Sequence, residues 1–213
     1  MTFGVADLTR WLLALLVSVA ALSGCRRDEP APGPEPMTAA QVQEVLARDG
    51  PSGDGRFPGG TFTFGSPFDN SDSPFDDADT ADGSGISGRV ASASWDIYWH
   101  RNDGDVGSWG VGIDVLRTPG RAARALDEEA AFWCPGDRRE VQDLGGGGLT
   151  DVRASSCRRA GGDGFYATLD ATDGQVLTSL TVGGPTRRSA VAALRAVWPA
   201  IRDAVVRVHA SLG

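Results

Sequence analysis

Few side chains in this 213-residue chain are suited to acid–base or nucleophilic catalysis. There are two histidines, His100 and His209, and no lysine, so a serine–lysine hydrolase motif is excluded. Neither histidine lies in an H-E-x-x-H metal motif, and no serine lies in the G-x-S-x-G setting of a nucleophile elbow. The sequence therefore predicts a protein that is not an enzyme, and both histidines are expected at the surface or at the rim of the core.

Three short segments match cofactor or metal motifs only in part. Gly83–Gly88 fits the string G-x-G-x-x-G, but an acidic segment precedes it where a strand is required. Gly145–Gly148 lacks the Lys-Ser/Thr of a phosphate loop and indicates a flexible turn. Asp77, Asp79 and Asp82 miss the register of a calcium loop by one residue. No cofactor or formed metal site is predicted; the aspartates favour a segment that attracts cations weakly, with a calcium site as the alternative.

The charge balance excludes one large class of partner. The net charge is -8, and every basic residue apart from the two histidines is arginine. Binding to a phosphate backbone requires a clustered positive face that releases counterions. Nucleic acid is therefore not an expected partner.

The amino terminus has the pattern of a processing signal. Trp11–Leu22 is a run of twelve uncharged residues, too short for a comfortable membrane span but typical of a signal-peptide core. The next residues complete "LSGC", Leu22–Cys25, which resembles the lipobox of bacterial lipoproteins. The resemblance implies that residues 1–24 are removed and that Cys25 receives diacylglycerol, typically with a further acyl chain such as palmitate. The alternatives are an ordinary secretory signal or an uncleaved anchor.

The residues after Cys25 would then form a tether. Residues 25–36 include Arg26 and Arg27, which can attract anionic headgroups, followed by a proline-rich stretch that extends roughly 30 Å. We expect a protein lipid-anchored to the cell membrane, on its extracytoplasmic face. In that oxidising compartment the remaining cysteines, Cys134 and Cys157, are expected to form a disulfide, with a catalytic thiol as the alternative.

Two segments precede the main domain. Residues 37–50 predict a helix that begins with a capping box, Thr38 with Gln41, and ends at Gly50. Residues 51–87 are rich in Gly, Pro, Ser and Asp and predict a mostly disordered linker. The phenylalanines of this linker could instead dock on the domain or on a partner: Phe57, Phe62, Phe64, Phe68 and Phe75.

Residues 88–213 predict an α+β domain. Val90–His100 alternates, with Trp95 and Trp99 on one face, and "NDGD" from Asn102 predicts a hairpin turn. A second hairpin is expected around Thr172-Asp173-Gly174. The last helix carries apolar residues at spacings of three and four, and Pro199 is expected to kink or split it. We predict an antiparallel sheet of about five to six strands, with helices packed on one face and one disulfide.

Three further segments carry a family resemblance: "TAAQVQEVL", "PGRAARALDEEAAFWC" and "GFYATLDATDGQVLTSLTVGG". With the lipobox, they resemble small actinobacterial lipoproteins of unknown function. In the order of their elements they are similar to the extracellular sensor domains of mycobacterial serine/threonine kinases. No binding residue is carried over from either family.

The function expected from these patterns is non-catalytic. We predict an envelope lipoprotein whose domain binds a partner protein or a small ligand. One alternative is a carrier of apolar molecules, which requires a large apolar pocket between the sheet and the last helix. The other is an envelope hydrolase, which requires a cleft with converging polar groups.

Overall fold

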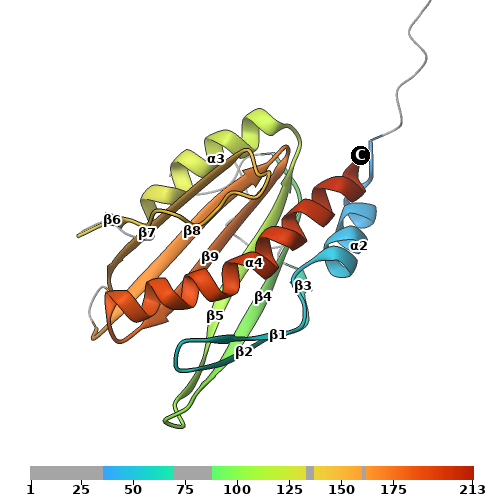
Figure 1. Cartoon of the computed structure of the whole chain (residues 1–213). Coiled ribbons are helices and arrows are strands. Elements are labelled where there is room, and N and C mark those ends of the chain that lie inside the picture. The colour runs from blue at the N-terminus through green and yellow to red at the C-terminus, as the bar shows by residue number, and fades with distance from the viewer. Residues whose placement is uncertain (1–35, 70–87, 133–136, 160–161) are drawn as a thin grey trace, which may run out of the picture. The chain divides into compact units, whose positions relative to one another are not determined.

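Strands with alternating apolar and polar residues build one antiparallel sheet of nine strands (Figure 1). The structure is a computed structural model that describes residues 36–69, 88–132, 137–159 and 162–213, with the side chains of 128–132 left out. Its strands are β1 (Asp54–Phe57), β2 (Gly60–Phe64), β3 (Phe68–Asp69), β4 (Arg89–Arg101), β5 (Val106–Leu116), β6 (Arg139–Glu140), β7 (Asp151–Arg158), β8 (Phe165–Asp173) and β9 (Val176–Gly184). The strand order is β1-β2-β4-β5-β9-β8-β7-β6, and β3 pairs with β4. The sheet is thus larger than the five to six strands predicted.

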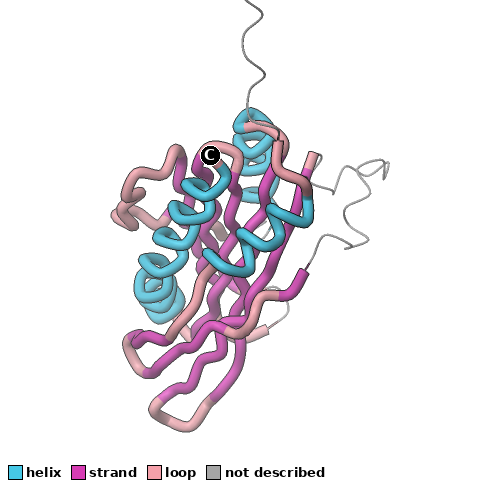
Figure 2. The backbone as a smooth tube through the Cα atoms, turned by 90° about the vertical axis from the view of Figure 1, so that its right-hand side faces the viewer, coloured by secondary structure: helices cyan, strands magenta, loops and turns pink. Residues whose placement is uncertain are grey.

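Both predicted hairpins are confirmed. β4 and β5 pair with Trp95 opposite Val111 and Ile97 opposite Trp109. Gly104 in the turn has a positive φ of 88°, which favours glycine there. Figures 1 and 2 show this hairpin extending below the helices. β8 and β9 form the second hairpin, in which Gly174 has a φ of 56°.

The helices cover both faces of the sheet, so the prediction that they pack on one face is wrong. α2 (Ala39–Asp49) contacts β4, and α4 (Arg187–Leu212) crosses in front of β8 and β9 (Figure 1). α3 (Pro119–Phe132) packs on the opposite face, where Leu126 and Leu177 share a small separate core. In β9, Leu177 points to the face that α3 covers, while its neighbours Val176 and Thr178 point to the face that α4 covers.

The predicted capping box of α2 is confirmed: Thr38 accepts from the Gln41 backbone N–H at 3.3 Å, and Gln41 Oε1 accepts from the Thr38 backbone N–H at 2.8 Å. α2 is joined to the end of α4 by Ser211, whose hydroxyl donates to Asp49 Oδ2 at 2.7 Å. Arg48 bonds the same carboxyl, and these contacts lower the pKa of Asp49 to about 2 although partial burial acts against them. The amino-terminal helix therefore belongs to the domain.

α4 provides the main apolar surface of the core. It is one helix of 26 residues, so Pro199 does not split it. The side chains that it buries against the sheet follow the predicted stripe, with Leu194, Trp198, Ile201 and Val205 at 0–1 % exposure.

The segment from residue 137 to 150 lies along α4. Trp198 Nε1 donates to the Gly145 carbonyl at 3.2 Å, and Arg195 donates to the Gln142 carbonyl at 3.1 Å. Gly147 has a φ of 56°, and a Cβ there would lie 2.6 Å from Arg202 Cδ. The glycine run is therefore not merely a flexible turn: it permits close packing against the helix.

The predicted linker 51–87 is wrong over residues 51–69. These residues form β1, β2 and β3, and Phe57, Phe62 and Phe64 are 4–8 % exposed in the main core. The alternative that these phenylalanines dock on the domain is the correct one. The compact unit accordingly spans Met37–Gly213 and not 88–213. Residues 70–87, with Phe75 and the Asp77–Asp82 cluster, lie outside the described residues.

Two predicted sites at cysteines stay untested. Cys157 lies in β7 at 3 % exposure, but Cys134 is outside the described residues, so the disulfide remains a prediction. Cys25 is also outside them. Across the described ranges, no helix combines the length and the apolar character needed to span a membrane.

Candidate binding face

The two faces of the sheet differ in chemistry because each strand alternates. Val111, Leu169 and Leu180 face α4 and belong to the main core. Their neighbours along the same strands point to the opposite face of the sheet, the face on which α3 packs. We call this opposite side the polar face; its side chains are Ser92, Ser94, Asp96, Asp114, Thr168, Asp170, Thr172, Ser179 and Thr181.

One half of the polar face is covered. α3 packs over Leu116 and Leu177, and Asp127 of α3 forms an ion pair with Arg153 of β7. Thr168 shares a hydrogen bond of 3.1 Å with Ser155. A buried polar group is costly unless it has a partner, and here the hydroxyls have one.

The covered half also holds a buried ion pair. Asp114 is 7 % exposed, and its Oδ1 lies 2.8 Å from Arg89 Nε. Burial raises the pKa of the Asp114 carboxyl, while Arg89 and a hydrogen bond from Ser92 act in the opposite direction. This pair fixes the first residues of β4 against β5, next to a register shift between Arg89 and Ala91.

Among the residues that the structure describes, nothing covers the other half of the polar face. A Cβ built on Gly110 would meet no atom within 4 Å, and one on Gly112 would meet only Ser94 Oγ, at 3.8 Å. Gly112 lies directly opposite Ser179, whose hydroxyl oxygen is buried without a hydrogen-bond partner in the described structure. We call this region the open half: a floor of two glycines with hydroxyl groups beside it.

Two exposed aromatic side chains border the open half. Phe68 of β3 pairs with Ser94 and is 46 % exposed; Tyr98 of β4 is 49 % exposed. The Tyr98 hydroxyl donates to Asp96 Oδ2 at 3.4 Å, a long bond that places the ring beside this carboxylate. Large exposed aromatic side chains beside polar groups are typical of interaction surfaces.

The two histidines do not come together: His100 lies on the polar face, two residues beyond Tyr98 in β4, and His209 lies near the carboxyl end of α4. His100 is exposed and lies on the side of β4 opposite Trp95 and Trp99, as expected. His209 lies in the last turn of α4, where its Nδ1 is 2.7 Å from Asp173 Oδ2. Among the described residues, no three His, Cys, Asp or Glu side chains group closely enough to hold a metal ion.

The carrier alternative requires a large apolar pocket between the sheet and α4, and the structure gives no support for one there. The space between α4 and the sheet is filled by side chains at 0–1 % exposure, including Trp95, Trp198 and Leu169. A depression of about 450 Å³ does lie on the outer side of α2, lined by Ala39, Ala40, Gln43, Glu44, Ala47 and Asp69. It is open to solvent and does not enclose a ligand.

The comparisons with known proteins add one weak likeness. No protein-family model matches the chain. No curated protein matches it either. Among solved structures it is similar to the extracellular domain of PknH from Mycobacterium tuberculosis, with 11 % identity and a TM-score of 0.41, covering 82 % of this chain and 93 % of that one. No residue role is transferred from this likeness.

Proposed function

We propose that the chain is a lipid-anchored envelope protein whose extracytoplasmic domain binds a partner protein, without catalysis, through the open half of the polar face. One observation carries the proposal: among the described residues, a floor of two uncovered glycines lies between hydroxyl groups and two exposed aromatic side chains. A protein surface can approach such a floor closely because no side chain projects from it.

The shape of the open half favours a protein over a small molecule. Small-molecule sites are concave and bury most of their ligand. Here the floor residues are on a sheet surface, and Gly110 is exposed. Hydrogen-bonding groups beside aromatic side chains on an open surface match the composition of protein interfaces.

The non-catalytic part of the proposal is supported by the positions of the acid–base groups. His209 is held by Asp173 at the end of α4, and Asp114, whose pKa is raised, is paired with Arg89 beneath α3. Asp114 lies two residues from Gly112 on the same face of β5, but its carboxylate is engaged by Arg89. Asp96, opposite Gly110, accepts from the Tyr98 hydroxyl. This arrangement also gives the hydrolase alternative no support.

The anchor is tested by lipid labelling. We expect the full-length chain, expressed in bacterial cells, to incorporate radiolabelled palmitate and to lose the label completely in Cys25→Ser, because no other residue offers the lipobox thiol. Incorporation is measured by autoradiography of the immunoprecipitated protein. Cys157→Ser is the matched control and should keep the label. A Cys25→Ser protein that still carries palmitate would refute the anchor.

The binding face is tested by filling its floor. We expect Gly110→Trp to reduce recovery of the partner from native membranes about tenfold, since the new indole occupies the space a partner must enter. Recovery is compared by quantitative mass spectrometry of pull-downs with the full-length protein. Gly120→Trp is the control, because a Cβ there also meets open space but lies in the first turn of α3. Equal recovery with both variants would exclude the open half as the interface.

A further inference from the structure

One end of the domain carries arginines from three separate segments of the chain. They come from the start of β6, from the end of β7 and from the first turn of α4. Five of them are exposed, and Arg187 is half-buried. We call this set the basic end: Arg138, Arg139, Arg158, Arg159, Arg187 and Arg188.

Contacts between the segments hold the basic end together. The guanidinium carbons of Arg158 and Arg187 lie 5.6 and 5.1 Å from the centre of the Phe165 ring. Arg187 also donates to the Ser156 carbonyl at 2.7 Å and to Asp137 Oδ2 at 2.6 Å. The Ser156 hydroxyl donates to the Arg139 carbonyl at 3.4 Å. The three segments therefore gather their charges at one end of the domain, with Arg158 and Arg187 over Phe165 and Arg159 over Tyr166 on the opposite face of β8.

The charge of this surface is opposite to that of the protein. The same segments and the adjoining turn contain six arginines but only three acidic residues, Asp137, Glu140 and Asp163. The chain as a whole has a net charge of -8. No acidic residue occupies the first turn of α4, where the helix dipole favours negative charge. Arg187 and Arg188 lie there against the dipole, so their positions do not serve the stability of the helix.

We propose that the basic end binds a short acidic peptide segment of a partner protein. Arginine can recognise carboxylates through paired N–H donors, and Arg187 already donates one N–H group to the Asp137 carboxylate and others to the Asp137 carbonyl. The segment is short because Glu140 and Asp163 border the basic end and the rest of the acidic protein repels a longer polyanion. Such charges mainly raise the rate and the selectivity of association.

A bilayer is a poorer fit to the basic end than an acidic peptide. Binding in a membrane interface needs apolar side chains that insert. Phe165 and Tyr166 lie under the guanidinium groups of Arg187 and Arg159, at 5.1 and 4.9 Å. In the described structure, the large apolar side chains that are exposed belong to other segments: Phe68, Tyr98, Val106 and Val206.

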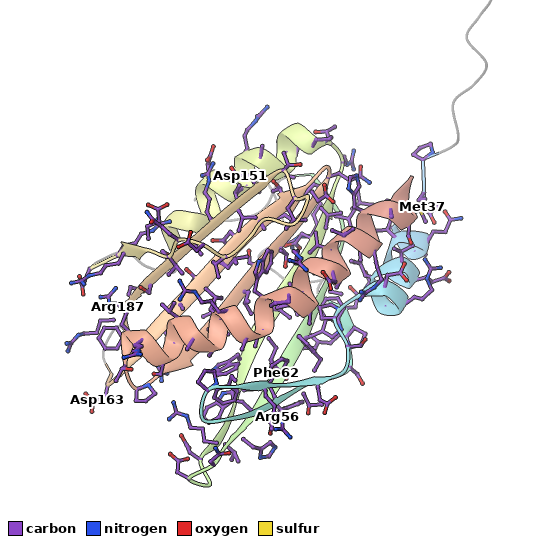
Figure 3. The ribbon with its side chains drawn as sticks, viewed as in Figure 1. Met37, Arg56, Phe62, Asp151, Asp163 and Arg187 are labelled. Carbon is purple, nitrogen blue, oxygen red and sulfur yellow. The ribbon has the colours of Figure 1, made fainter. Side chains whose placement is uncertain are left out.

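The basic end lies at the opposite end of the domain from Met37. Figure 3 shows Arg187 and Met37 at opposite ends of α4 and the sheet. This surface is distinct from the open half, so either can fail a test while the other passes.

The test is a titration of the full-length protein in neutral detergent with a fluorescent eight-residue peptide of alternating Asp and Glu. We expect fluorescence anisotropy to show saturable binding that weakens as salt rises from about 0.05 to 0.5 M. Arg138→Gln with Arg188→Gln should raise Kd at least about threefold, since two ion pairs are lost. Neither side chain forms a hydrogen bond or ion pair in the described structure, so the fold should be preserved.

The matched control is Arg56→Gln with Arg117→Gln, which makes the same change in net charge at two exposed arginines elsewhere. It should leave Kd unchanged within about 1.5-fold. Three results would overturn the proposal: equal weakening by the control, equal binding of an Asn/Gln peptide, or tighter binding of polyphosphate or of phosphatidylglycerol vesicles than of the acidic peptide.

Discussion

Trp198→Ala is expected to lower the free energy of unfolding by about 3–5 kcal/mol, the range for removing a large aromatic side chain from a core. Trp198 is 1 % exposed on the face of α4 that packs against the sheet. Its indole N–H also satisfies the Gly145 carbonyl, so the variant would leave a cavity and loosen the glycine segment. Urea denaturation followed by circular dichroism measures the change.

Two variants separate the contributions of Trp198. Trp198→Phe keeps most of the apolar volume and removes the hydrogen bond, so it should cost less, about 1–3 kcal/mol. Val206→Ala, in the same helix but 40 % exposed, should stay within about 0.5 kcal/mol of the wild type. A Trp198→Ala protein as stable as the Val206→Ala protein would show that α4 does not pack as described.

Arg89→Met is expected to destabilise the domain by about 3–5 kcal/mol at pH 7, because it leaves the buried Asp114 carboxylate without its cation. The cost should shrink as the pH falls. Burial already raises the pKa of Asp114 in the folded protein above that in the unfolded chain, and losing Arg89 raises it further. The folded state then holds the proton more tightly, so its stability is greatest at low pH and is lost as pH rises through the folded pKa.

A double-mutant cycle provides the control for the ion pair. Asp114→Asn in the Arg89→Met background removes the unpaired charge, so it should recover part of the lost stability at pH 7 and flatten the pH dependence. Unfolding free energies between pH 4 and pH 8 would be compared for the four proteins. A destabilisation by Arg89→Met that is independent of pH would contradict the role given to Asp114.

The parts of the fold that the sequence predicted well depend on local signals. The capping box of Thr38 and Gln41, the turn at Gly104 and the apolar stripe around Trp198 each involve residues a few positions apart. Such patterns fix an element because the required geometry repeats within one turn or one hairpin. The side of the sheet that each helix covers is not local, and there the prediction for α3 was wrong.

Strands β1, β2 and β3 were not predicted because a glycine can either make a segment flexible or make room for a neighbouring side chain. A glycine-rich composition indicated disorder for residues 51–69. In the structure, a Cβ on Gly55 would lie 2.4 Å from the Phe62 ring, and a Cβ on Gly60 would lie 2.7 Å from the Phe57 ring. These glycines make room for aromatic side chains that pack from the neighbouring strand. Composition alone does not separate this use from flexibility.

The open half was missed for a related reason. Its floor, Gly110 and Gly112, has no side chains, and its borders come from β3, β4 and β9, which the register alone brings together. A signal was present in "VASASWD" and "GSWGVGID", where small and polar residues alternate with apolar ones. That alternation identifies a polar face; only the structure shows that part of it is uncovered.

The central claim is that the open half contacts a partner protein in the cell envelope. Its most direct test places a photo-reactive benzophenone amino acid at position 110 of the full-length chain and irradiates intact cells. We expect a cross-linked product of higher mass from position 110 and none from position 206, on the outer side of α4. No product from position 110, or the same product from both positions, would contradict the account.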